Sequence, residues 1–219
     1  MGIAQADIVV VAVKPVDMAR ALEEVRTAIS SRQLVLSLVA GVSARTIESL
    51  LPGNVPIIRA MPNTSSFVQA SATAISRGTR ASSSHLEMAQ KLFSAIGSVV
   101  VVDESLLDPV TGLSGTGPAY FYYVVEALME AGFPYGLSEE TCRALLLQTV
   151  EGTAKMLKET GKSPAELRRQ VTSPNGTTIA AISVLEQGGA HDLFVRAVRR
   201  ATERAAEIGR EASVIPMLW

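Results

Sequence analysis

The run IVVVAV at residues 8–13 is apolar throughout and rich in β-branched side chains. A strand covered on both faces reads as such an unbroken run, whereas a strand with one solvated face alternates apolar and polar residues. A helix-like segment follows at residues 16–30, and a second apolar run lies at residues 34–40. This alternation with short connections is typical of a parallel sheet covered by helices.

The alternation continues to about residue 103 and then ends. Further strands are predicted at residues 56–60, 71–76 and 99–102, and further helices at residues 44–51 and 86–95. Beyond this point only helices are predicted, at residues 118–131, 138–159, 163–170, 177–187 and 191–209. We therefore expect an α/β domain at residues 1–104 followed by an all-α domain at residues 105–219.

Composition narrows the class of protein. Hydrophobic residues make up 47% of the 219 residues, and a net charge of −1 gives no general attraction for nucleic acid or an anionic membrane. The single cysteine, Cys142, excludes an internal disulfide and fits a reducing, cytoplasmic setting. With only His85 and His191, a histidine-rich metal site or a Ser-His-Asp triad is disfavoured. No apolar run reaches the roughly 18 residues that cross a bilayer, and no signal peptide is recognisable.

Small residues, prolines and polar groups follow three predicted strands where each strand ends. The segments are AVKP at residues 12–15, LVAGV at residues 38–42 and RAMPNT at residues 59–64. Ligands of open parallel sheets bind at the carboxyl ends of the strands. Taken alone, AVKP could equally be an ordinary strand exit with an exposed lysine. Together the three exits predict a ligand site along one edge of the sheet.

The segment TSPNGTT at residues 172–178 stands directly before a predicted helix. The first N–H groups of a helix are unpaired, and the helix dipole favours negative charge there. With several hydroxyl donors added, the segment can form a cup for a carboxylate or phosphate. The alternative interpretation is that the Ser and Thr residues only cap the helix.

The glycine-rich segment GLSGTGPAY at residues 112–120 lies between the two predicted domains. Its glycines permit tight turns, and Pro118 suits the first turn of a helix. As a dinucleotide fingerprint the segment is weak, because no strand directly precedes it. We expect a domain junction that brings Ser114 and Thr116 near the edge of the sheet.

Some predicted helices are apolar around most of their circumference, notably at residues 120–129 and 144–150. Such helices must be buried, and a single helical layer of this size cannot cover them all. A subunit interface is the expected location. The alternative is an internal core packed on the first domain.

Together, these motifs resemble the pyrroline-5-carboxylate reductases, the enzymes of the last step of proline biosynthesis. Glu126, KM at residues 155–156 and VLEQGG at residues 184–189 add to the resemblance, which runs from residue 1 to about residue 210. It implies an incomplete Rossmann-like dinucleotide-binding domain followed by a helical dimerisation and substrate-binding domain. The implied reaction is the reduction of 1-pyrroline-5-carboxylate to L-proline by NADPH or NADH, in a homodimer or higher homo-oligomer.

The resemblance also assigns residues to roles. Thr178 matches the residue that hydrogen-bonds the ring nitrogen of the substrate, as its orienter or proton donor. The substrate-binding positions are Ser173, Gly176, Thr177 and Thr178, with Ser173 and Thr177 toward the carboxylate. The positions that match the cofactor site are Ala12, Val13, Lys14, Pro15, Leu38, Val39, Ala40 and Asn63.

Two features depart from the family pattern. The family begins with a strand and a Gly-rich loop, and the strand at residues 8–13 matches the fourth strand of the family, so the resemblance implies a reductase truncated at its N-terminus. Because the missing loop normally holds the cofactor pyrophosphate, we expect weak NAD(P)H binding. Asn175 stands where the commonest family form has glycine.

The alternatives to the implied reductase function are an impaired subunit that only oligomerises, and a related imine or hydroxyacid reductase.

Overall fold

The structure is a computed structural model, and it describes residues 2–214. The described chain forms two compact units. Residues 2–118 and 197–214 make up the first, here called the sheet unit, and residues 119–196 make up the second, the helical unit. The predicted division of the chain into domains at residues 104 and 105 stays a prediction.

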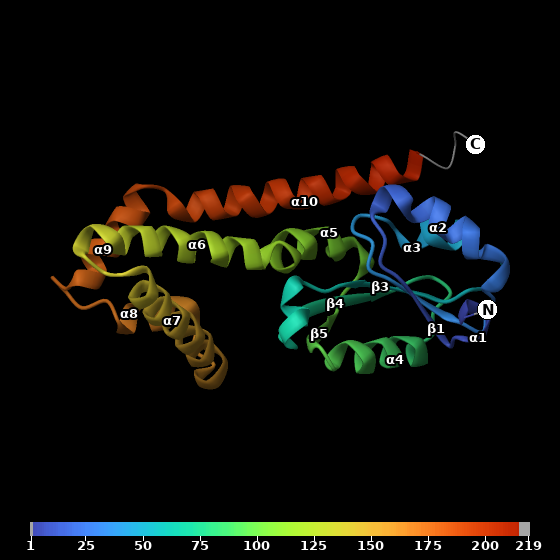
Figure 1. Ribbon diagram of the computed structural model, residues 1–219, viewed down its shortest axis with the longest axis horizontal. Helices are drawn as coiled ribbons and strands as arrows, with labels where there is room; N and C mark the ends of the chain where they lie inside the picture. The colour runs from blue at the N-terminus through green and yellow to red at the C-terminus, as the bar shows by residue number, and fades with distance from the viewer. Residues whose placement is uncertain (1, 215–219) are drawn as a thin grey trace. The chain divides into compact units, whose positions relative to one another are not determined.

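A five-stranded sheet with the order β1-β2-β3-β4-β5 forms the centre of the sheet unit (Figure 1). The strands are β1 (Ile8–Val11), β2 (Leu34–Ser37), β3 (Ile57–Met61), β4 (Ser71–Arg77) and β5 (Gly97–Val101). The sheet is mostly parallel, as predicted, but β3 and β4 pair antiparallel. Residues 62–70 between them are too few for the crossover of a dozen or more residues that parallel neighbours require.

The helices follow the predicted segments closely. In the sheet unit they are α1 (Gly2–Gln5), η1 (Pro15–Asp17), α2 (Met18–Val25), η2 (Arg26–Ala28), α3 (Ala44–Leu50), η3 (Thr64–Val68), α4 (Ser83–Ser94), η4 (Glu104–Leu106), α5 (Leu107–Val110) and η5 (Thr111–Gly115). The later helices are α6 (Gly117–Gly132), η6 (Phe133–Tyr135), α7 (Glu139–Thr160), α8 (Pro164–Gln170), α9 (Thr177–Gln187) and α10 (Ala190–Val214).

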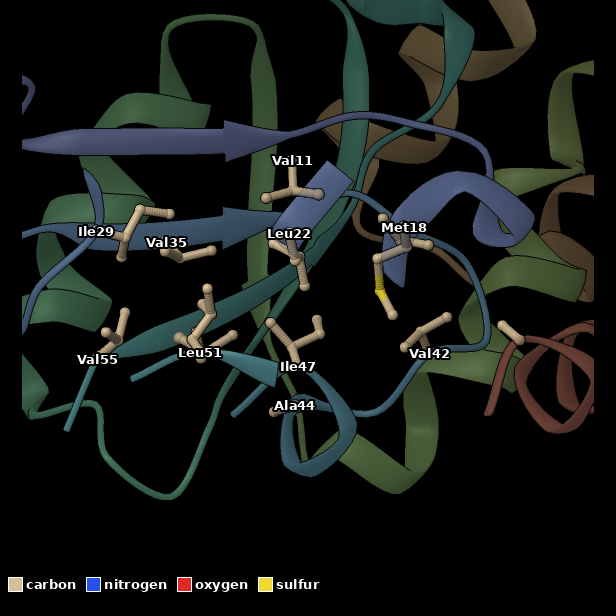
Figure 2. Packing of buried hydrophobic residues seen from close by; sticks show 13 residues of the cluster. Val11, Met18, Leu22, Ile29, Val35, Val42, Ala44, Ile47, Leu51 and Val55 are labelled. Atoms are coloured by element: carbon tan, nitrogen blue, oxygen red, sulfur yellow. The ribbon is translucent and has the colours of Figure 1, made fainter. Parts of the chain in front are cut away.

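Two clusters of buried side chains lie on the two faces of the sheet. On β2, Leu34 and Leu36 belong to the cluster under α4, whereas Val35 belongs to the cluster under α2 and α3. Figure 1 shows these helices on opposite faces, and Figure 2 shows the second cluster, with Val11 and Met18 among its members. The sheet is therefore the middle layer of three.

The run at residues 8–13 is less buried than its apolar sequence predicts. It forms β1 at an edge of the sheet, and Val10 is 51% exposed. The helix α4 packs mainly against β3, β4 and β5, so that face of β1 is covered only in part, at Ile8. Burial on both faces is therefore correct for β2 and wrong for β1.

Backbone-to-backbone packing fixes the connection between β2 and α3 against α10. Gly41 has φ +75°, and a Cβ at this position would overlap the carbonyl oxygen of Ala205 and lie 2.7 Å from the nitrogen of Gly209. A Cβ at Gly209 would in turn overlap the carbonyl oxygen of Gly41. Two glycines thus allow this connection and the helix to meet without side chains between them.

We predict that Gly41→Ala destabilises the protein more than Gly53→Ala. Both glycines are left-handed, with φ +75° and +60°, so both changes carry a backbone cost of about 1–2 kcal/mol. Only position 41 adds overlap with α10, because a Cβ at Gly53 meets no atom within 4 Å. That overlap should add about 1–3 kcal/mol. Urea unfolding followed by circular dichroism measures both losses, and equal losses would contradict the packing argument.

Candidate functional site

The loop before α9 turns sharply and then starts the helix at Thr177. Asn175 is left-handed with φ +59°, a conformation that Asn adopts more readily than most residues. Gly176 is the N-cap residue, and its N–H donates to the carbonyl of Ser173 at 3.1 Å. A Cβ at Gly176 would lie 2.5 Å from Ser173 Oγ, so a larger residue there would force the Ser173 side chain to move.

The hydroxyl groups of this loop do not cap α9. Its N-cap is Gly176, and no side chain caps the helix start. Ser173 and Thr177 are exposed, and Thr178 is half-buried. The first N–H groups of α9 have no partner within the helix, since its first turn leaves them free. The loop therefore presents hydroxyl and N–H donors together, which suits a carboxylate.

The three predicted strand exits lie side by side at one edge of the sheet unit. The strands β1, β2 and β3 are parallel neighbours, so their carboxyl ends coincide. The N–H of Leu38 donates to the carbonyl of Val11 at 2.9 Å, which continues the pairing past the strand ends. The exposed predicted cofactor residues are Ala12, Val13 and Lys14, and the half-buried ones are Pro15, Leu38, Ala40 and Asn63. Val39 is only 3% exposed, so its side chain packs in the core and only its backbone can reach a ligand.

Asn63 joins the exit of β3 to the glycine-rich segment. Its Oδ1 accepts from the N–H of Ser65 at 3.1 Å, and its Nδ2 donates to the carbonyl of Ser114 at 3.1 Å. This confirms the expected position of Ser114 near the sheet edge. The N–H and Oγ1 of Thr116 instead both donate to the carbonyl of Thr111, at 2.8 and 2.9 Å.

The glycine-rich segment does not form the predicted tight turn. It continues from the π-helix η5 into α6, and Gly112, Gly115 and Gly117 all lack positive φ. Gly112 serves close packing, because a Cβ there would lie 2.8 Å from the carbonyl oxygen of Val198. A Cβ at Gly115 would meet the flexible end of Met61 at 2.7 Å, and one at Gly117 would meet no atom within 4 Å. Sequence alone does not separate the two uses, because both need a missing side chain.

A cluster of charged side chains at the same edge was not foreseen in the sequence. Arg59 on β3 donates from Nη1 to Glu104 Oε1 at 3.0 Å, and Asp108 on α5 interacts with both side chains and with Arg210. Burial raises the pKa of Asp108, Arg59 and Arg210 oppose that rise, and Glu104 adds to it. An arginine between Ile58 and Ala60, in a strand otherwise apolar up to its end, was the available sequence signal.

Two classes of site receive no support within residues 2–214. No group of three or more His, Cys, Asp or Glu side chains is placed to hold a metal ion. No helix there has the length and apolar character needed to cross a membrane.

Comparison with known proteins identifies the family. Residues 104–208 match the family model for pyrroline-5-carboxylate reductase dimerisation. Pyrroline-5-carboxylate reductase 1 of Bacillus spizizenii is 41% identical over 92% of this chain and 68% of its own length. The chain belongs to the pyrroline-5-carboxylate reductase family. The reductase structure from Coxiella burnetii is 41% identical, with a TM-score of 0.86 over 94% of this chain and 77% of that chain. The Plasmodium falciparum reductase structure, with NADP bound, is 28% identical, with a TM-score of 0.89 over 94% and 79%.

We predict that Thr178→Ala costs little stability. Because no side chain caps α9, the loss in unfolding free energy should stay below about 0.5 kcal/mol. Ser138→Ala is the matched control, since Ser138 Oγ caps α7 by accepting from the N–H of Thr141 at 3.2 Å, a contact worth about 1 kcal/mol. Thermal unfolding of both variants decides the matter, and equal losses would show that the Thr178 hydroxyl holds the helix start.

The raised pKa of Asp108 predicts a pH-dependent stability. A carboxyl whose pKa is higher in the folded than in the unfolded chain contributes stability below the ordinary value of 3.8, and this is lost as pH rises through the folded value. Asp108→Asn removes the titration. The unfolding free energy of the wild type relative to this variant should therefore fall as pH rises from below 3.8 toward neutrality. Urea titrations across this range measure the difference, and a rise would mean that the two arginines outweigh burial.

Proposed function

We propose that this protein is a pyrroline-5-carboxylate reductase that reduces 1-pyrroline-5-carboxylate to L-proline with NADPH or NADH. The observation that carries the proposal is the 41% identity to a reductase over 92% of the chain. The motifs predicted from the sequence are spread over most of the same length. The donor-rich start of α9 and the open strand exits are both suited to this reaction.

The exits of β1 and β2 fit a nicotinamide cofactor. Ala12 is exposed and Ala40 half-exposed, so their small side chains leave room for a flat ring to lie against the backbone. Lys14 is exposed beside them, which suits a phosphate or ribose oxygen. When bound, the cofactor supplies the hydride that the imine carbon accepts.

The α9 loop fits the substrate. In this proposal Ser173 and Thr177, with the unpaired N–H groups of the helix start, hold the carboxylate and so fix the orientation of the ring. The Thr178 hydroxyl bonds the ring nitrogen, accepting from a protonated imine or donating to a neutral one. No histidine or paired carboxylate is required, because a protonated imine is already electrophilic.

We further propose that the helical unit forms a homodimer. Phe121, Tyr122 and Tyr123 on α6 are about two-thirds exposed, at 65%, 66% and 72%. A groove of about 540 Å³ between α6 and α7 has a mostly apolar lining that includes Phe121, Tyr122, Val125, Leu147 and Val150, and three glutamates, Glu126, Glu130 and Glu139, also border it. An apolar surface of this kind marks an interaction site. The cytoplasmic location stays a prediction.

The proposed reaction predicts a specific defect for Thr178→Ala. Loss of one hydrogen bond to the reacting ring should lower kcat about tenfold or more, whereas Thr178→Ser, which keeps the hydroxyl, should retain most of the activity. The assay follows NADPH and NADH oxidation by the purified protein with 1-pyrroline-5-carboxylate and identifies L-proline as the product.

Two outcomes would contradict the proposal. Turnover of an unrelated imine or oxo acid with no proline formation would favour a related reductase. Absence of both turnover and L-proline binding at the α9 loop, measured by amide chemical shifts, would favour a subunit that only oligomerises.

A further inference from the structure

Arg59 is buried in the sheet on the side of α2 and α3. Its neighbours Ile58 and Ala60 belong to the cluster under α4, so Arg59 points to the opposite face. Its side chain is 7% exposed. A guanidinium at such a position needs a charged partner, and Glu104 provides it through the 3.0 Å bond to Nη1.

One carboxylate oxygen of Glu104 makes two connections. Glu104 Oε1 accepts from Arg59 Nη1 and also from the backbone N–H of Ala44 at 2.6 Å. Ala44 is the first residue of α3, whose N-cap Ser43 accepts from the N–H of Thr46 at 3.1 Å. Glu104 therefore satisfies a helix-start N–H that the N-cap side chain does not reach.

These bonds bracket the connection between β2 and α3. Ser37, the last residue of β2, pairs with Arg59 in the ladder, so the connection leaves the sheet beside Arg59. Ala44, at the other end of the connection, is held by Glu104. Residues 38–43 lie between these two points and include Ala40. Arg59 lies on β3 itself, and Asn63 follows it by four residues at the exit of that strand.

We propose that Arg59 and Glu104 are positioning residues for the cofactor edge, which hold the β2–α3 connection and the β3 exit in one fixed arrangement. The proposal rests on the proposed function, because it takes this edge as the NAD(P)H site. Neither side chain is assigned a contact with the cofactor. Their effect is indirect, through the backbone of residues 38–44 and 61–63.

Glu48 offers a matched control, because it lies on α3, the helix whose first N–H is held by Glu104. Glu48 is 5% exposed, and its carboxylate accepts from the N–H and Oγ1 of Thr79 at 2.8 and 2.7 Å. Thr79 follows the end of β4, which runs antiparallel to β3, so this contact lies at the edge of the sheet opposite the three exits. Glu48 thus holds a loop by the same chemistry but away from the predicted site.

The experiment compares Glu104→Ala, Glu104→Gln and Glu48→Ala with the wild type. Hydrogen exchange of the ligand-free proteins reports the positioning itself, and NADPH titration followed by fluorescence reports its consequence. For Glu104→Ala we expect faster exchange at residues 38–44 and a Kd for NADPH raised about fivefold or more. Glu104→Gln keeps an acceptor for Ala44 and should recover part of the affinity. Glu48→Ala should speed exchange near residue 79 and leave the Kd unchanged.

The outcomes separate this inference from the proposed function. Unchanged exchange at residues 38–44 in Glu104→Ala, or equal increases in Kd for Glu104→Ala and Glu48→Ala, would overturn the positioning role. If Glu104→Ala shows the expected faster exchange but the wild type binds no NADPH, the positioning role is supported and the proposed function is contradicted. A raised KM for NADPH with an unchanged KM for 1-pyrroline-5-carboxylate would support both.

Discussion

The parallel pairing of β1, β2 and β3 is the constraint on which the candidate cofactor edge depends. Strands in a sheet lie about 4.8 Å apart, so parallel neighbours must deliver their carboxyl ends to one place. The bond from Leu38 to Val11 carries that pairing one step beyond the strands. Segments that are more than twenty residues apart in the sequence, such as residues 12–15 and 38–42, thereby become neighbours. Their short side chains together leave an open edge for a ligand, which no single strand exit would provide.

The helix α10 adds a second constraint at the same edge. Glycines from two segments, Gly41 and Gly112, meet its backbone, and its own Gly209 completes the first contact. Only Gly41 of these three has positive φ. Glycine at position 41 is therefore favoured for two reasons, the left-handed backbone and the lack of space for a Cβ. Close backbone contact leaves little freedom for small adjustment, because interiors pack at nearly crystalline density. The connection between β2 and α3 is therefore held by packing on one side and by Glu104 on the other.

The positions of the helices could be predicted from the sequence, because they depend on residues that are close together in the chain. The helix at residues 177–187 has the predicted bounds, since its apolar periodicity and the preceding loop are both in the sequence. The exposure of Val10 was not predictable, because it depends on which strands α4 covers. The direction of β4 depends on the length of one connection and on pairing partners that no local pattern records. The sequence also did not predict that α9 lacks a side-chain cap, because only the structure shows that Gly176 is its N-cap residue.

The identity of residue 59 supports a role beyond stability. Burying an ion pair usually gains little over well-packed apolar residues of similar volume, because desolvation offsets the attraction between the charges. Ile58 and Ala60 show that apolar side chains fill the other face of β3 without difficulty. An apolar residue at position 59 could fill the core in the same way, but it could not hold the carboxylate that also binds the N–H of Ala44. What arginine adds is a fixed link between a strand and the start of a helix, at the edge where the proposed reaction needs backbone atoms held in place.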